Sequence, residues 1–93
     1  MTTQIENVLE IAANALKQLG AHEIYVFGSA ANGRMRDESD IDLAVAGLSP
    51  ELFFKAMSRA TDILGRPVDL VDLDNESPFV HYLKEEKELK RVG

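Results

Sequence analysis

The sequence predicts an α/β (α+β) fold in which short strands alternate with amphipathic helices. Three short apolar runs have the length and composition of strands: 24–27, 41–46 and 68–73. Around them, apolar residues recur at helical spacing over 5–19 and 53–64. The 93 residues are enough for a modest hydrophobic core, so we expect a single domain over 1–93.

The first helix is predicted to begin near Thr3 and to end at Gly20. Thr3 and Glu6 have the spacing of a capping box, in which each side chain accepts a hydrogen bond from a free backbone N–H. Gly20 can adopt the left-handed conformation that ends many helices. One face of this helix is apolar: Ile5, Val8, Leu9, Ala12, Leu16 and Leu19.

Glycines bound the first two predicted strands. The run 24–27 is apolar at every position, which is typical of a strand buried on both faces, and Gly28 follows at once. The second strand, 41–46, ends at Gly47, and the third covers 68–73.

The segment 49–51 predicts the start of the second long helix. Ser49 is a good cap, Pro50 suits the first helical position, and Glu51 places an acid in the first turn. Gly65 is the expected end of this helix. Its core face contains Phe53, Met57, Ala60 and Leu64.

The C-terminal segment begins with a second cap-plus-proline pattern. Ser77 and Pro78 predict a helix that continues to about Glu85. The segment 87–92 fits either a helix or a short edge strand protected by lysines, and the sequence leaves both open.

Composition narrows the classes of function. Ten Lys and Arg against 16 Asp and Glu give a formal charge of −6, so we expect no direct nucleic-acid binding. The absence of cysteine excludes disulfides, thiolate metal sites and a cysteine nucleophile, and it fits a reducing, cytoplasmic setting. No apolar run approaches the roughly 20 residues of a membrane span, and the acidic N-terminus does not resemble a signal peptide.

Asp40 and Asp42 form a D-x-D pair at the start of the second strand. Side chains alternate along a strand, so both carboxylates face one way and Ile41 faces the core. Two carboxylates roughly 7 Å apart repel each other unless a cation lies between them, and Mg²⁺ prefers such oxygen ligands. The alternative is an exposed strand with ordinary polar alternation.

Gly28 and Ser29 follow the first strand directly. Glycine lets the backbone turn tightly, and free N–H groups with the serine hydroxyl can bind phosphate. The alternative is an ordinary strand-to-helix turn. A phosphate cradle beside a D-x-D pair nevertheless predicts a site for a nucleotide and a metal.

A third carboxylate is expected from the last strand, which offers Asp69, Asp72 and Asp74. Asp69 is favoured because it is embedded between apolar residues, where a charge is costly unless it is paired or bound to metal. Asp72 points to the opposite face, and Asp74 can serve the following turn.

The runs GSAANGRMRDESDIDLAV and VDLVDLD together resemble the minimal nucleotidyltransferases of the DNA polymerase beta superfamily. The resemblance covers about 24–73 and implies a nucleotidyltransferase fold, with a small mixed sheet of three to four strands and helices packed on it. It implies that Gly28 and Ser29 bind the phosphates of ATP and that Ser39 orders the same loop. One departure is Asn32, where relatives carry a basic residue, so Arg34 or Arg36 is a candidate for that phosphate contact.

The same resemblance implies that Asp40, Asp42 and Asp69 are the catalytic metal ligands. They would hold two Mg²⁺ ions, and Asp69 would help to deprotonate the attacking hydroxyl. Minimal members of the family resemble antitoxins paired with HEPN ribonuclease toxins, which implies transfer of AMP from ATP to a toxin tyrosine. The alternatives are a non-catalytic antitoxin that acts by contact, or a nucleotidyltransferase acting on a small molecule or RNA.

Aromatic residues outside the motif are assigned to packing. Tyr25 is expected to be packed, with its hydroxyl reaching a partner. Phe53, Phe54 and Phe79 fit core or interface positions better than base stacking.

Overall fold

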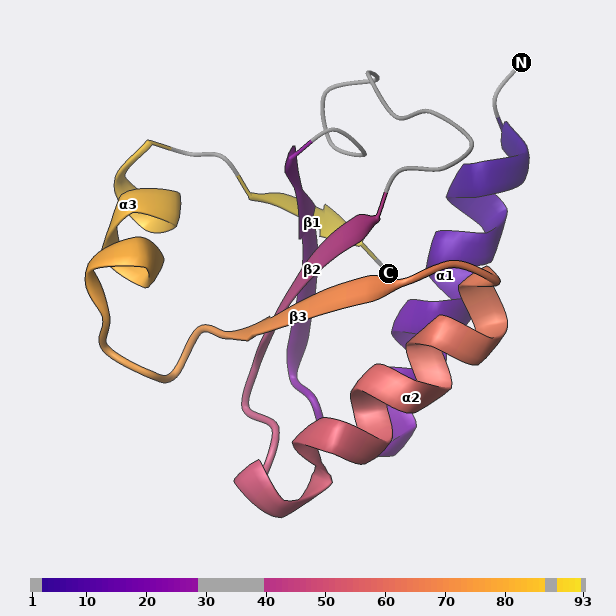
Figure 1. Ribbon diagram of the computed structural model, residues 1–93, viewed down its shortest axis with the longest axis horizontal. Helices are drawn as coiled ribbons and strands as arrows, with labels where there is room; N and C mark the ends of the chain where they lie inside the picture. The colour runs from indigo at the N-terminus through magenta and orange to yellow at the C-terminus, as the bar shows by residue number, and fades with distance from the viewer. Residues whose placement is uncertain (1–2, 29–39, 87–88, 93) are drawn as a thin grey trace.

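The computed structural model describes residues 3–28, 40–86 and 89–92, and side chains from residue 7 onward within these ranges. The strands and the long helices over the described residues follow the expected order (Figure 1). In chain order they are α1 (Thr3–Gln18), β1 (Glu23–Phe27), β2 (Ile41–Ala46), the 3₁₀ turn η2 (Pro50–Leu52), α2 (Phe53–Leu64), β3 (Val68–Asp72), α3 (Pro78–Glu85) and β4 (Lys90–Val92).

The strands form one mixed sheet in the order β3-β2-β1-β4. β1 runs antiparallel to both β2 and β4, whereas β2 and β3 are parallel. α1 and α2 cover one face of the sheet, and α3 lies on the other (Figure 1). The expected small mixed sheet with helices packed on it is therefore confirmed.

The larger core lies between the sheet and the helices α1 and α2. Leu16 and Ile41 are fully buried in it, and Ala56 and Ala60 allow α2 to approach closely. The predicted apolar face of α2 packs there, with Phe53, Met57 and Leu64 partly buried. The sheet contributes Ile24, Val26, Ile41, Leu43, Val45, Val68 and Leu70.

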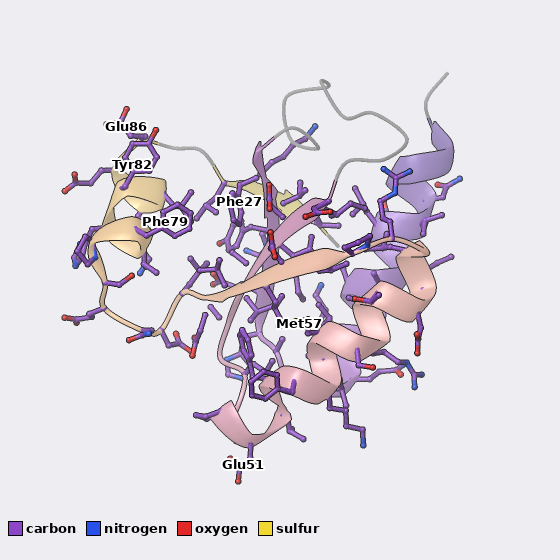
Figure 2. The ribbon with its side chains drawn as sticks, viewed as in Figure 1. Phe27, Glu51, Met57, Phe79, Tyr82 and Glu86 are labelled. Atoms are coloured by element: carbon purple, nitrogen blue, oxygen red, sulfur yellow. The ribbon has the colours of Figure 1, made fainter. Side chains whose placement is uncertain are left out.

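A smaller core lies on the opposite face, beneath α3. Phe27 and Ala44 from the sheet meet Val80 and Leu83 from α3, and Leu73 closes the cluster. Figure 2 shows Phe27 on the side of α3 and Met57 on the side of α2. Because α3 has only eight residues, it covers part of this face.

Local signals account for most element ends. Gly65 adopts the left-handed conformation, with φ of 72°, and ends α2 as predicted. Ser77 caps α3, because its Oγ accepts a hydrogen bond from the Val80 N–H at 3.2 Å. At the C-terminal segment, where the sequence left helix and strand open, Lys90–Val92 form the edge strand β4, paired with β1.

The prediction that Ser49 caps α2 is wrong. The Ser49 hydroxyl makes no cap hydrogen bond; it donates to the Glu51 carboxylate, and this bond lowers the pKa of Glu51. The chain therefore enters α2 through the turn η2. Within the described ranges, no helix is long and apolar enough to cross a bilayer.

The two serines give a matched test of the capping assignment. Ser77→Ala should lower the free energy of unfolding by about 1 kcal/mol, because the Val80 N–H loses its acceptor. Ser49→Ala should change it by less than half as much. Urea denaturation of both variants measures the difference, and an equal loss in the two would contradict the assignment.

Candidate functional site

Three acidic residues come together where β1 ends and where β2 and β3 begin. The parallel register places Asp42 directly beside Asp69. Asp40 lies two residues before Asp42, at the entrance to β2. On the other side, Phe27 of β1 is the register partner of Asp42, so the turn at Gly28 also reaches this point. The sheet thus joins the two sequence motifs into one site.

The acids occupy the same face of the sheet as α3. Ile41 and Leu43 are buried against α1 and α2, so alternation turns Asp42 to the other face, together with Ala44. Asp42 is half-buried, whereas Asp40 and Asp69 are exposed. Partial burial of one carboxylate between two exposed ones leaves the site open to a ligand from solvent.

Asp69 lies beside Asp42, but its side chain is not buried as the sequence led us to expect. The sequence suggests a carboxylate embedded among apolar residues, but the Asp69 side chain is exposed. Val68 and Leu70 are its apolar neighbours, and both point into the opposite core. Asp69 belongs to the cluster because of its register with Asp42.

The competing acids, Asp72 and Asp74, serve the other end of β3. The Asp72 carboxylate accepts a hydrogen bond from the Asp74 N–H at 2.9 Å. The Asp74 carboxylate accepts one from the Gly47 N–H at 2.7 Å, which ties the turn after β3 to the end of β2. Both therefore have structural roles away from Asp42.

The surroundings of Asp42 disfavour the charged form of its carboxyl group. Burial raises the pKa of Asp42, and the negative charges of Asp69 and Asp40 raise it further. A side-chain hydrogen bond with Asp69 acts in the same direction, as expected when two carboxyl groups share a proton. The described residues around this carboxyl therefore leave its charge uncompensated.

Gly28 cannot be replaced without disturbing this cluster. Its φ is 70°, a conformation that side chains rarely adopt. A Cβ at this position would also collide with the Oδ2 atom of Asp42. Glycine therefore lets the backbone leaving β1 pass directly against the Asp42 carboxylate.

The donor atoms suit a hard cation, although the acids do not form a complete cage. No group of three or more His, Cys, Asp or Glu side chains in the described ranges is arranged to hold a metal ion. Asp42 and Asp69 do approach each other, and Mg²⁺ is often bound by one or two carboxylates together with water and substrate phosphates. Two adjacent carboxylates, of which Asp42 has a raised pKa, fit that mode of binding.

Several predicted phosphate-binding residues fall outside the part of the chain that the structure describes. Ser29 and Ser39 lie in the segment 29–39, as do Asn32, Arg34 and Arg36. Their assigned roles stay predictions.

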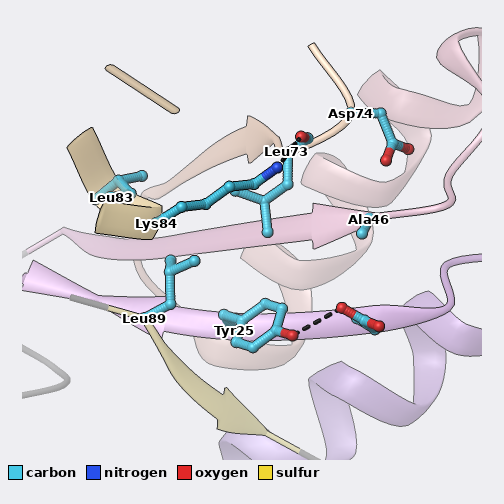
Figure 3. A pocket seen from close by; sticks show the side chains of 8 residues that line it. Tyr25, Ala46, Leu73, Asp74, Leu83, Lys84 and Leu89 are labelled. Atoms are coloured by element: carbon cyan, nitrogen blue, oxygen red, sulfur yellow. Dashed lines mark hydrogen bonds between the residues drawn. The ribbon is translucent and has the colours of Figure 1, made fainter. Parts of the chain in front are cut away.

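A separate pocket of about 320 Å³ lies at the opposite end of the α3 face (Figure 3). Tyr25 donates a hydrogen bond to Glu23 at 2.7 Å on one side of it, which confirms the expected partner for its hydroxyl. On the other side the Lys84 ammonium donates to the Leu73 carbonyl at 3.3 Å. None of the three clustered acids lines this pocket, and no sequence motif indicated it. Its lining consists of Glu23, Tyr25, Ala46, Leu73, Asp74, Leu83, Lys84 and Leu89.

The raised pKa of Asp42 predicts a dependence of stability on pH. The folded state holds the Asp42 proton more tightly than the unfolded state, so its contribution to stability is present below the ordinary Asp pKa of about 3.9 and is lost as the pH rises through the raised pKa. Asp42→Asn should therefore raise the Tm at pH 7 in metal-free buffer. Thermal melts from pH 3 to pH 7 should show this advantage shrinking as the pH falls.

Asp62→Asn is a suitable control for that measurement, because Asp62 is exposed on α2 and absent from the cluster. It should leave the Tm nearly unchanged across the range. A lower Tm for Asp42→Asn at pH 7 would show that the carboxylate stabilises the fold, against our interpretation.

Comparisons with known proteins agree with this fold. A family model described as "Polymerase beta, Nucleotidyltransferase" matches residues 6–90. A chain from a toxin–antitoxin crystal structure with AMP-PNP is 28% identical, with a TM-score of 0.74; the match covers 95% of this chain and 72% of that one. A structure assigned as a minimal nucleotidyltransferase is 26% identical, also with a TM-score of 0.74, and the match covers 91% of this chain and 92% of the other.

A more distant match comes from a complex of tri-AMPylated Shewanella oneidensis HEPN toxin with an MNT antitoxin. It is 24% identical with a TM-score of 0.59, and the match covers 91% of this chain and 71% of that one. At this identity the similarity establishes the shared fold. A comparison with curated protein sequences found no match.

Proposed function

This chain belongs to the polymerase beta nucleotidyltransferase family, and on that premise we propose that it transfers AMP from ATP to a tyrosine hydroxyl of a HEPN ribonuclease toxin and so acts as its antitoxin. The observation that carries the proposal is the pairing of Asp42 with Asp69 beside Gly28. This pairing places the family's acidic motif and its glycine turn on one face of the sheet.

The transfer is an in-line displacement at the α-phosphorus of ATP. The acceptor oxygen forms a bond to that phosphorus, the bond to the bridging oxygen breaks, and pyrophosphate leaves. The hydroxyl proton passes to the Asp69 carboxylate, which is exposed and therefore accessible to an acceptor. Bound Mg²⁺ would be held by Asp42 and Asp69, with Asp40 beside them, and would offset the charge of the carboxylates and the triphosphate.

The other predicted site residues orient the nucleotide. Gly28 lets the backbone approach the phosphates closely, since any side chain there would occupy the space against Asp42. Ser29 and Ser39 are proposed to contact the same phosphates.

Support for a protein partner comes from the solved relatives and from charge. The 28%-identical chain was crystallised in a toxin–antitoxin complex with AMP-PNP, an analogue of ATP. The formal charge of −6 does not favour a nucleic-acid acceptor, because phosphates would be repelled. A reaction that consumes ATP has the cytoplasm as its expected compartment.

The sequence leaves a second candidate function open, that of an antitoxin that neutralises its toxin by contact alone. The two functions differ in one respect: only the enzyme needs an intact acidic pair to protect against the toxin.

The predicted base gives the sharpest test of the enzyme. Asp69→Asn should lower the rate of AMP transfer by about 10²- to 10⁴-fold, because the acceptor hydroxyl loses the group that takes its proton. The purified protein is incubated with its toxin, ATP and Mg²⁺, and intact mass spectrometry counts the AMP units added to the toxin.

Asp74→Asn is the matched control, since it changes an acid that follows the same strand but binds the Gly47 N–H instead. It should retain transfer. If the unaltered protein adds no AMP, or if Asp69→Asn still protects cells from the toxin as well as the unaltered protein does, the contact mechanism replaces the enzymatic one.

A further inference from the structure

A strip of three aromatic rings leads from the acidic site onto α3. Phe27 lies opposite Asp42 in the sheet, Phe79 packs on Phe27, and Tyr82 follows one turn later on α3 (Figure 2). We infer that Phe79 is the platform on which the base of the bound nucleotide stacks. This inference rests on the proposed function and adds the residue that would recognise the nucleoside end of ATP.

Phe27 connects the ring of Phe79 to the acids. It is 8% exposed and belongs to the smaller core, so its ring is held in place. The centroid of the Phe79 ring lies 5.9 Å from that of Phe27, with the planes inclined at 64°. Through this edge-to-face contact, Phe79 packs directly on Phe27, the register partner of Asp42.

Packing uses only part of Phe79. The ring is 49% exposed, whereas the next residue, Val80, is buried beneath α3. Helix α3 is anchored at both ends, by the Ser77 cap and by the Lys84 hydrogen bond to the Leu73 carbonyl. Phe79 is therefore a fixed, half-open aromatic surface.

The Phe79 ring lies on the same sheet face as the acids, because it packs on Phe27. In this proposal, a nucleotide with its phosphates at Gly28 and Asp42 lies with its base along the α3 face of the sheet, toward Phe79. On the α3 side, the first exposed aromatic ring beyond Phe27 is Phe79 among the described residues. Stacking on an aromatic ring accepts any base, because every base offers a π-face.

The experiment compares two ligands that differ only in the nucleoside. Affinities for ATP and for inorganic triphosphate, each with Mg²⁺, are measured by calorimetry on the full chain. Phe79→Ala should weaken ATP binding by about 5- to 150-fold, which corresponds to 1–3 kcal/mol at 1.4 kcal/mol per factor of ten, and should leave triphosphate binding unchanged.

Three further variants complete the design. Phe54→Ala removes a ring that is 78% exposed on α2, on the other side of the sheet, and should change neither affinity. Phe79→Trp should retain ATP binding because it keeps the π-face. Phe79→Leu keeps an apolar side chain against Phe27 and should weaken ATP binding alone, even if the alanine variant folds poorly.

The outcomes separate this inference from the proposed function. If the unaltered protein does not bind ATP, the proposed function fails. If it binds ATP but Phe79→Leu binds ATP equally well, or loses triphosphate to the same extent, the stacking role is wrong. Loss of toxin binding by Phe79→Leu with unchanged ATP affinity would assign the strip to the partner and overturn the inference.

Discussion

Two carboxylates placed side by side are the constraint on which this site depends. The parallel register of β2 and β3 sets Asp42 against Asp69, and burial then makes the charge of Asp42 harder to maintain. A protein selected for stability alone would avoid this arrangement, because like charges on neighbouring strands are destabilising. The sheet tolerates it because the opposite face of the same strands is well packed. A cation bound between the two carboxylates would offset their mutual repulsion.

The two faces of the sheet differ in how much they bury. The face covered by α1 and α2 buries the largest side chains, including Leu16, Ile41 and Leu43. The face beneath α3 buries fewer residues and leaves its acidic end open. β2 links the faces, since Leu43 and Val45 pack on one side while Asp42 and Ala44 occupy the other. The packing of β2 on both faces thus holds the Asp42 carboxylate in a defined position.

Much of the fold could be predicted from the sequence because its local signals are strong. The strand at 41–46, the left-handed end at Gly65 and the cap at Ser77 all agree with the structure. The prediction for Ser49 was wrong because its hydroxyl bonds to the Glu51 carboxylate and makes no hydrogen bond with the helix backbone. The residue types alone do not show which of these two bonds forms. β4 was ambiguous because its pairing with β1 is a contact between distant parts of the chain.

The meeting of Asp42 with Asp69 agrees with the expectation from the sequence, whereas the surroundings of these acids could not be predicted. Asp69 was chosen for an expected burial that it lacks, and strand register gives the better reason. Phe79 was assigned to packing, since sequence cannot show that it touches Phe27 with one edge and leaves half its surface open. Contacts of this kind depend on how α3 docks across the sheet.

A crystal structure with Mg²⁺ and a non-hydrolysable ATP analogue tests the central claim most directly. The account predicts an ion bound between Asp42 and Asp69 at about 2.0–2.1 Å from their oxygens, with the phosphates against Gly28. An analogue bound elsewhere on the molecule, or phosphates at Gly28 with no ion touching either carboxylate, would contradict it.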